Sequence, residues 1–215
     1  EIIMKKLFLA TSLIALATTA SAGFTGGYAG LKVDHAWTKF SASDTTTQTS
    51  IDNNISGFEA DLFGGYGLNA AADWIYGFEG HIGHGFSEAT KGFSETGITQ
   101  GNLKNRRLWK LGVAARVGRT FNGNVLAYAR LGIHMNQYEY RVTAQNVQAA
   151  KSTFASWEIA PGVGVEYAFN DSVNGRLEYV YEYAMNTKEV NFGGRKFKIN
   201  RPKTNVVTLG VSFAL

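Results

Sequence analysis

Apolar and polar residues alternate along much of the chain. Between Trp157 and Phe169, every odd position is apolar and every even position is charged or small. Residues 109–117 and 207–215 repeat this pattern without interruption, and residues 125–135 repeat it except that Leu126 and Tyr128 stand among the even positions. Because successive side chains of a β-strand point to opposite faces, each of these segments predicts a strand with one apolar face and one narrow, polar face.

Four further segments follow the alternation less tightly. They lie within residues 29–37, 58–68, 74–83 and 176–183, and His35 and Phe63 fall on the wrong face of their segments. Together the segments predict eight strands. Pro161 lies in the middle of one of them and has no N–H for the ladder, so we expect a local bulge there.

The connections between the predicted strands alternate in length. Residues 69–73, 122–124 and 170–172 are short and rich in Asn and Asp, as tight turns require. Residues 38–56, 87–105, 139–151 and 186–201 form long polar connections. This predicts an all-β protein, an eight-stranded antiparallel up-and-down barrel with turns at one end and loops at the other, the layout of a transmembrane β-barrel.

A soluble barrel with its apolar face inside is the alternative. The polar face is dominated by Gly and Ala, which suits a narrow lumen better than a water-facing surface. Aromatic residues of the apolar face collect in two groups: Trp37, Phe58, Phe86, Trp109, Trp157 and Tyr183 near the loops, and Tyr66, Trp74, Tyr167, Phe169 and Phe213 near the turns. Two aromatic belts around an aliphatic band favour the membrane barrel.

The first 22 residues have the pattern of a secretory signal peptide. Met4-Lys5-Lys6 precedes an apolar run over residues 7–17, and Ala20-Ser21-Ala22 is a small-residue cleavage site. We expect residues 1–22, including three upstream residues, to be removed and residues 23–215 to form one outer-membrane domain. No run approaches the ~20 apolar residues of a membrane helix.

The composition excludes several kinds of functional site. The chain of 215 residues has 25 Gly, 2 Pro and no Cys, which excludes disulfides, cysteine-ligated metals and a cysteine nucleophile. A net charge of +4 is too small to favour a nucleic-acid partner.

Charged residues recur on the narrow face. The predicted lumen residues are Lys32, Asp34, Glu59, Asp61, Glu79, Lys110, Arg116, Arg130, Glu158, Glu166, Arg176 and Glu178, together with Glu182, His81 and His134. Buried charges have to pair, so a salt-bridge network that fills the lumen is favoured. The alternative is a narrow water-filled path that passes small ions.

No catalytic, metal or cofactor site is expected. A lipid A deacylase of this size uses a His-x-Ser pair, and no His in this chain is followed two positions later by Ser. His81 and His84 are three residues apart, so in a strand they point to opposite faces and share no metal.

The last long connection is strongly basic. Arg195, Lys196, Lys198 and Arg201 would lie at the depth of lipopolysaccharide phosphates, which suggests lipopolysaccharide contacts. An ordinary solvated loop explains these residues equally well.

Three segments resemble a known family. Gly26-Gly27-Tyr28-Ala29-Gly30-Leu31, Gly162-Val163-Gly164-Val165-Glu166-Tyr167 and Thr208-Leu209-Gly210-Val211-Ser212-Phe213 look like the porin-like outer-membrane β-barrels, small surface antigens related to opacity proteins and to OmpA- and OmpX-type barrels. The resemblance implies outer-membrane lipid as surroundings, insertion by the barrel-assembly machinery, and a role in envelope integrity, host-surface contact or weak porin activity. Some family members bind haem. One departure is the ending Phe213-Ala214-Leu215, where the family's insertion signal usually ends in an aromatic residue.

Overall fold

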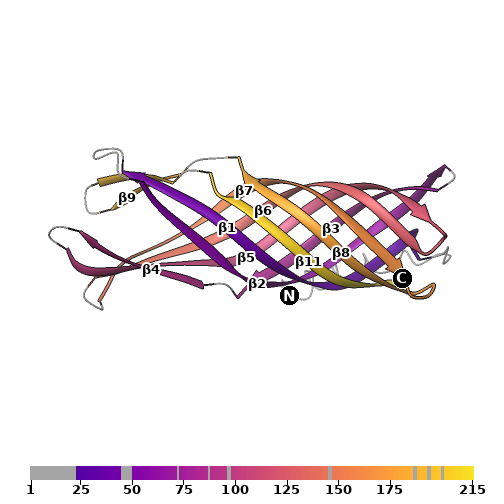
Figure 1. Ribbon diagram of the computed structural model, residues 1–215, viewed down its shortest axis with the longest axis horizontal. Helices are drawn as coiled ribbons and strands as arrows, with labels where there is room; N and C mark the ends of the chain where they lie inside the picture. Colours follow the sequence, from indigo (N-terminus) through magenta and orange to yellow (C-terminus); the bar gives the residue numbers. More distant parts are fainter. Residues whose placement is uncertain are drawn as a thin grey trace, which may run out of the picture.

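The described part of the chain consists of β-strands and turns (Figure 1). The computed structural model describes residues 23–44, 50–71, 73–86, 88–95, 98–144, 147–185, 188–192, 195–199 and 201–215. Within these ranges there is no helix with the length and hydropathy to cross a membrane. The predicted signal peptide lies outside the described residues and stays a prediction.

Eight strands form a closed antiparallel barrel. They are β1 (Gly26–Asp44), β2 (Ser50–Ala71), β3 (Trp74–Gly85), β5 (Ile98–Phe121), β6 (Val125–Ala144), β7 (Val147–Ala168), β8 (Val173–Ala184) and β11 (Lys203–Ala214). Each strand pairs with the next along this series, and β11 pairs with β1 to close the sheet. The predicted all-β, eight-stranded antiparallel barrel is confirmed.

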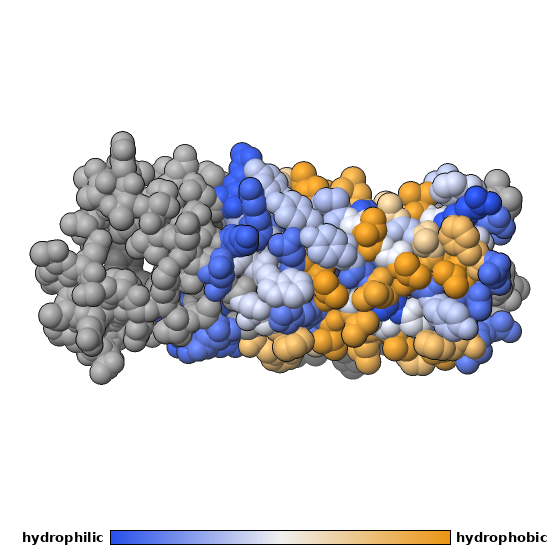
Figure 2. Space-filling view, in the orientation of Figure 1, coloured by the Kyte–Doolittle hydropathy of each residue, from blue (hydrophilic) through white to orange (hydrophobic). Residues whose placement is uncertain are grey.

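The two faces of the barrel wall have opposite polarity. The apolar side chains of the alternating pattern face outward, and Leu31, Val113 and Leu209 are each at least 60% exposed. Figure 2 shows these side chains as an apolar band over the wall, with hydrophilic residues at both ends of the band. The charged side chains of the opposite face are buried inside; they stand at even positions in most strands and at odd positions in β2 and β3. An apolar outside and a charged inside are what a bilayer requires of a barrel, and they exclude the soluble cup.

The short connections at residues 122–124 and 170–172 form the tight turns that their composition predicts, whereas residues 69–71 of the third belong to β2. Asn122 and Gly123 both have positive φ, 51° and 73°, which Asn and Gly tolerate best. The Asn170 side-chain oxygen accepts hydrogen bonds from the backbone N–H of Ser172 and Val173, both at 2.9 Å. The backbone conformation at Asn122 and Gly123 sets the turn between β5 and β6, and the hydrogen bonds of Asn170 set the turn between β7 and β8.

At the other end, strand pairing continues into segments predicted as loops. β1 and β2 remain paired out to Ser43 and Ser50, and β6 and β7 out to Ala144 and Val147. Three extra strands lie here: β4 (Glu88–Glu95) pairs with β5, and the hairpin of β9 (Lys188–Phe192) and β10 (Arg195–Ile199) pairs with β1. The prediction of long loops was wrong because polar composition alone does not end a strand, and antiparallel strands can carry polar residues where they leave an apolar environment.

The predicted bulge at Pro161 is also absent. The pairing between β7 and β8 keeps one register from Ile159–Tyr183 to Gly162–Val180, with no bridge at positions 160 and 161. On the β6 side, Pro161 pairs with Leu131 in register. The missing N–H of Pro161 therefore leaves a local gap in the pairing between β7 and β8, and neither strand has an extra residue there.

The aromatic residues form the belts predicted from the sequence. Near the loops, Trp37, Phe58, Trp109 and Trp157 are 40–59% exposed, and near the turns Trp74, Tyr167, Phe169 and Phe213 are 45–64% exposed. His35, which breaks the apolar pattern, packs against Trp37 and Phe58 at ring distances of 4.4 and 4.7 Å. Its amphipathic ring suits this interfacial depth.

Candidate functional site: the charged lumen

Glycines on the inward face create the room for the charged side chains. A Cβ at Gly164 would lie 2.5 Å from the Tyr128 hydroxyl, and a Cβ at Gly83 would overlap the Asp61 carboxylate. Because eight strands enclose a space only wide enough for side chains, each long residue needs a small one opposite. The high glycine content is thus explained by lumen packing.

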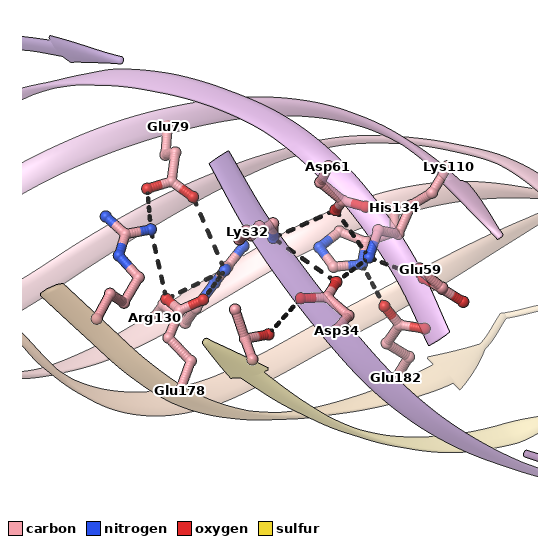
Figure 3. Close-up of polar contacts among 12 residues, drawn as sticks. Lys32, Asp34, Glu59, Asp61, Glu79, Lys110, Arg130, His134, Glu178 and Glu182 are labelled. Carbon is pink, nitrogen blue, oxygen red and sulfur yellow. Dashed lines mark hydrogen bonds and ion pairs between the residues drawn. The ribbon is translucent and has the colours of Figure 1, made fainter. Parts of the chain in front are cut away.

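The loop-side cluster is centred on Lys110 (Figure 3). Its ammonium nitrogen lies 2.5 Å from an oxygen of Asp34, 3.1 Å from Glu59 and 2.9 Å from Asp61. Lys32 adds a second cation 3.4 Å from Asp61. All five side chains are at most 4% exposed, so little water competes with these contacts.

Three of these carboxylates could in principle hold a metal ion. Oxygens of Asp34, Glu59 and Asp61 lie within 4.8 Å of one another. Lys110 contacts all three, so its ammonium already supplies the positive charge at the centre of this group.

Arg107 belongs to the same cluster, although the sequence pattern places it in a loop. It is 2% exposed, and its guanidinium lies 3.0 Å from Glu59 and 2.6 Å from Glu182. Between Arg107 and Lys110 the β5–β6 register shifts by one residue. The bulge reverses the alternation, so odd-numbered Arg107 and even-numbered Lys110 both face inward. No feature of the sequence signals this bulge.

Two histidines lie at the centre of the lumen. His134 Nδ1 is 2.8 Å from Glu182, and the rings of His81 and His134 meet edge to face with centroids 4.6 Å apart. Gly112 makes room for both rings. His84 instead faces outward against Trp109, at 4.8 Å between ring centroids, so His81 and His84 lie on opposite faces.

Glu158 lies at the edge of the loop-side cluster. It is fully buried and accepts a hydrogen bond from the Tyr138 hydroxyl at 3.0 Å.

The turn-side cluster contains three arginines and three glutamates. Arg176 bridges Glu79 at 2.5 Å and Glu166 at 2.7 Å, and Arg116 reaches Glu166 at 2.5 Å. Arg130 lies 3.1 Å from Glu178. The charges of these six residues are equal and opposite, so the cluster neutralises itself inside the low-dielectric barrel.

Aromatic side chains complete the turn-side cluster. The Tyr128 hydroxyl donates to Glu178 at 2.7 Å, and the Tyr28 hydroxyl donates to Glu79 at 3.2 Å. Arg176 stacks over the Phe63 ring at 4.4 Å from its centroid, which explains why Phe63 departs from the outward apolar pattern.

All twelve charged residues predicted to line the lumen are buried there, together with Glu182 and both histidines. The gap that remains between Ala114, Arg116, Arg130 and Glu178 has no room for a water molecule. At this level of the lumen, beside the turn-side cluster, side chains fill the barrel.

The predicted lipopolysaccharide residues lie at the loop end. Arg195, Lys196 and Lys198 belong to β10, and their side chains fall outside the described part of the structure. Arg201 is exposed, donates a hydrogen bond to the Tyr183 hydroxyl at 2.9 Å and stacks over that ring at 5.6 Å.

Comparisons with known proteins agree with this architecture. The family described as "Outer membrane protein beta-barrel domain" matches residues 7–214. The 25 kDa outer-membrane immunogenic protein of Brucella canis is 30% identical over 190 residues, covering 87% of this chain and 78% of the relative. Its counterpart from Brucella ovis is 32% identical over 178 residues, covering 80% and 77%.

Solved structures share the fold at low sequence identity. OprG from Pseudomonas aeruginosa aligns with a TM-score of 0.56 at 15% identity, covering 90% of this chain and 99% of that one. Neisserial surface protein A aligns with a TM-score of 0.50 at 18% identity, with the same coverage.

Proposed function

Because the chain belongs to the outer-membrane protein β-barrel domain family, we propose that it is a non-enzymatic barrel with a structural and surface-interaction role in the outer membrane. The observation that supports this proposal is the filled lumen, where buried ion pairs leave no room for water beside Arg116 and Arg130. A barrel closed in this way acts through its outer surfaces.

The loop end supports the surface-interaction part of the proposal. Strand pairing extends well beyond the belt of Trp37 and Trp157, which places ordered backbone outside the bilayer. The Brucella relatives carry the name immunogenic, which fits a barrel whose loop end acts as a surface antigen or adhesin. Its host or surface ligand has no signature in the sequence.

A narrow porin is the competing function. If the lumen conducts, its charged lining suits small ions. Folded full-length protein in planar bilayers tests both functions. The proposal predicts no current steps above leak for the wild type, and small steps for Arg116→Ala, which shortens a side chain of the turn-side cluster. Asp171→Asn, at an exposed position in the turn between β7 and β8, serves as the control. Reproducible wild-type steps that scale with salt concentration would establish the porin instead.

We also propose that basic residues of the loop end contact lipopolysaccharide phosphates. Arg201 carries an exposed guanidinium there, and Arg195, Lys196 and Lys198 share this end of the barrel through β10. Replacing the four residues with Gln should reduce the lipopolysaccharide retained after extraction, whereas Lys151→Gln on β7 should not. Equal retention in both variants rejects the contact.

A lipid A-modifying enzyme is the least supported alternative. Incubating the folded protein with lipid A and measuring the lipid mass tests it, and an unchanged mass is expected.

A further inference from the structure

A groove interrupts the outer wall of the barrel near the turns. It has a volume of about 720 Å³ and runs across the outer surface of β5, β6, β7 and β8. Its floor includes Ala127 and Ala129 of β6. Larger residues form its sides, Trp74 and Phe121 on one side and Tyr179 on the other. Small side chains between large ones create the depression.

The groove faces the hydrocarbon of one leaflet. Trp74 belongs to the turn-side aromatic belt and Phe121 is the last residue of β5 beside it; the two are 47% and 48% exposed. The groove takes in Val117, Gly118, Arg119 and Phe121 of β5. The four steps from Val117 to Phe121, at about 3.4 Å each in a strand tilted by about 40°, span about 10 Å of depth. This is less than the half-thickness of a hydrocarbon core about 30 Å thick, so the groove fits within the turn-side leaflet.

A pair of opposite charges lies at the head-group end of the groove. Arg119 lines the groove, and its guanidinium is 3.3 Å from the Asp73 carboxylate. Both side chains are about half exposed, at 55% and 54%. The Arg119 guanidinium also stacks on Phe121, 5.9 Å from the ring centroid. These contacts hold a cation and an anion side by side where lipid head groups lie.

We propose that this groove is a binding site for a phospholipid with a primary amine in its head group. Its acyl chain lies over Ala127 and Ala129, its phosphate accepts hydrogen bonds from Arg119, and its ammonium group faces Asp73. Arginine suits a phosphate because its guanidinium presents several donors in a fixed plane. A zwitterionic head group satisfies both members of the pair, whereas an anionic one leaves Asp73 opposed by a second negative charge.

Quenching of tryptophan fluorescence provides the test. The chain has four tryptophans, of which Trp37, Trp109 and Trp157 lie in the loop-side belt. Replacing these three with Phe leaves Trp74 as a reporter beside the groove. Folded, delipidated full-length protein in detergent is titrated with phosphatidylethanolamine that carries brominated acyl chains. The expected result is saturable quenching that phosphatidylglycerol produces only at higher concentration.

Three variants in this background locate the site. Ala129→Phe fills the groove and should abolish the saturable phase, as should the smaller filler Ala127→Leu if the first variant folds poorly. Ala60→Phe, at an outward alanine of β2, should leave the phase unchanged. Asp73→Asn should remove the preference for phosphatidylethanolamine over phosphatidylglycerol.

Two results would overturn the proposal. Linear quenching that is equal for Ala129→Phe and Ala60→Phe would mean ordinary annular lipid only. Sedimentation of the lipid-free protein as a dimer that Ala129→Phe dissociates would assign the groove to a second copy of the chain. Both results are independent of whether the barrel conducts ions.

Discussion

Several charged residues in the lumen contact more than one residue of opposite charge, among them Lys110 and Arg176. The Arg176 side chain has no exposed surface and lies within hydrogen-bond distance of both Glu79 and Glu166. A buried ion pair contributes little net stability compared with an apolar pair, but removing one partner leaves the other charge buried alone. The network is therefore sensitive to single substitutions.

Replacing Arg176 with Met should destabilise the barrel strongly. Glu79 and Glu166 would each lose a guanidinium contact, and breaking such a buried pair costs about 3–5 kcal/mol. The free energy of unfolding, measured in liposomes by urea titration of tryptophan fluorescence, checks this. Arg119→Gln, at an exposed pair with Asp73, should cost at most about 1 kcal/mol. Similar losses for both variants would show that the Arg176 pairs are not buried.

Two glycines on neighbouring strands give a matched test of lumen packing. A Cβ at Gly112 would lie 2.5 Å from His81 Nε2 and 2.7 Å from His134 Cδ2, whereas the nearest atom to a Cβ at Gly80 is 3.9 Å away. Gly112→Ala should cost about 1–3 kcal/mol through overpacking. Gly80→Ala should be neutral or slightly stabilising, because alanine restricts the unfolded chain. Equal unfolding midpoints for the two variants would contradict the packing described for the lumen.

Alternation along the sequence was enough to identify most lumen residues. Side chains such as Glu166 and Arg116 lie in uninterrupted strands, so their parity decides their face. Arg107 was missed because the bulge beside it changes the parity, and the bulge depends on pairing between β5 and β6. Contacts between residues distant in sequence, such as Lys110 with Asp34, require the closed barrel and have no local signal.

At the scale of elements, the bilayer part of each strand was predictable and its outer part was not. Inside the bilayer, lipid on one face and a packed lumen on the other impose alternation, as in residues 157–169. Beyond the belt, β9, β10 and the outer half of β2 carry mixed polar sequences without a strict alternation. Their pairing follows from the register of the strands within the bilayer, and composition does not encode that register.

Pro161 offers a test of the interrupted ladder between β7 and β8. Pro161→Val restores an N–H donor in an unchanged register and should raise the free energy of unfolding by about 1 kcal/mol, the net value of one hydrogen bond. Amide hydrogen exchange at positions 160–162 should slow at the same time. If Pro161→Val instead destabilised the barrel and sped up exchange, proline would fit this position better than valine does.

The whole molecule is a closed sheet with a charged interior and an apolar exterior. Closure by β1 and β11 removes both sheet edges within the bilayer, so the backbone hydrogen bonds of the wall are satisfied without water. On the proposed function, the surfaces that make contacts are the loop end and the outer wall, including the groove beside Arg119. Membership of the family agrees with this division but names no ligand.

The absence of cysteine in the sequence allows a direct measurement of which side chains meet lipid. Single nitroxide labels are attached to Leu131→Cys and Val163→Cys, at outward positions 60% and 58% exposed, and to Thr153→Cys beyond the loop-side belt. In liposomes, labels at 131 and 163 should collide more often with oxygen than with a water-soluble nickel chelate, and the label at 153 should show the reverse. Nickel collisions that exceed oxygen collisions at 131 and 163 would contradict the transmembrane barrel.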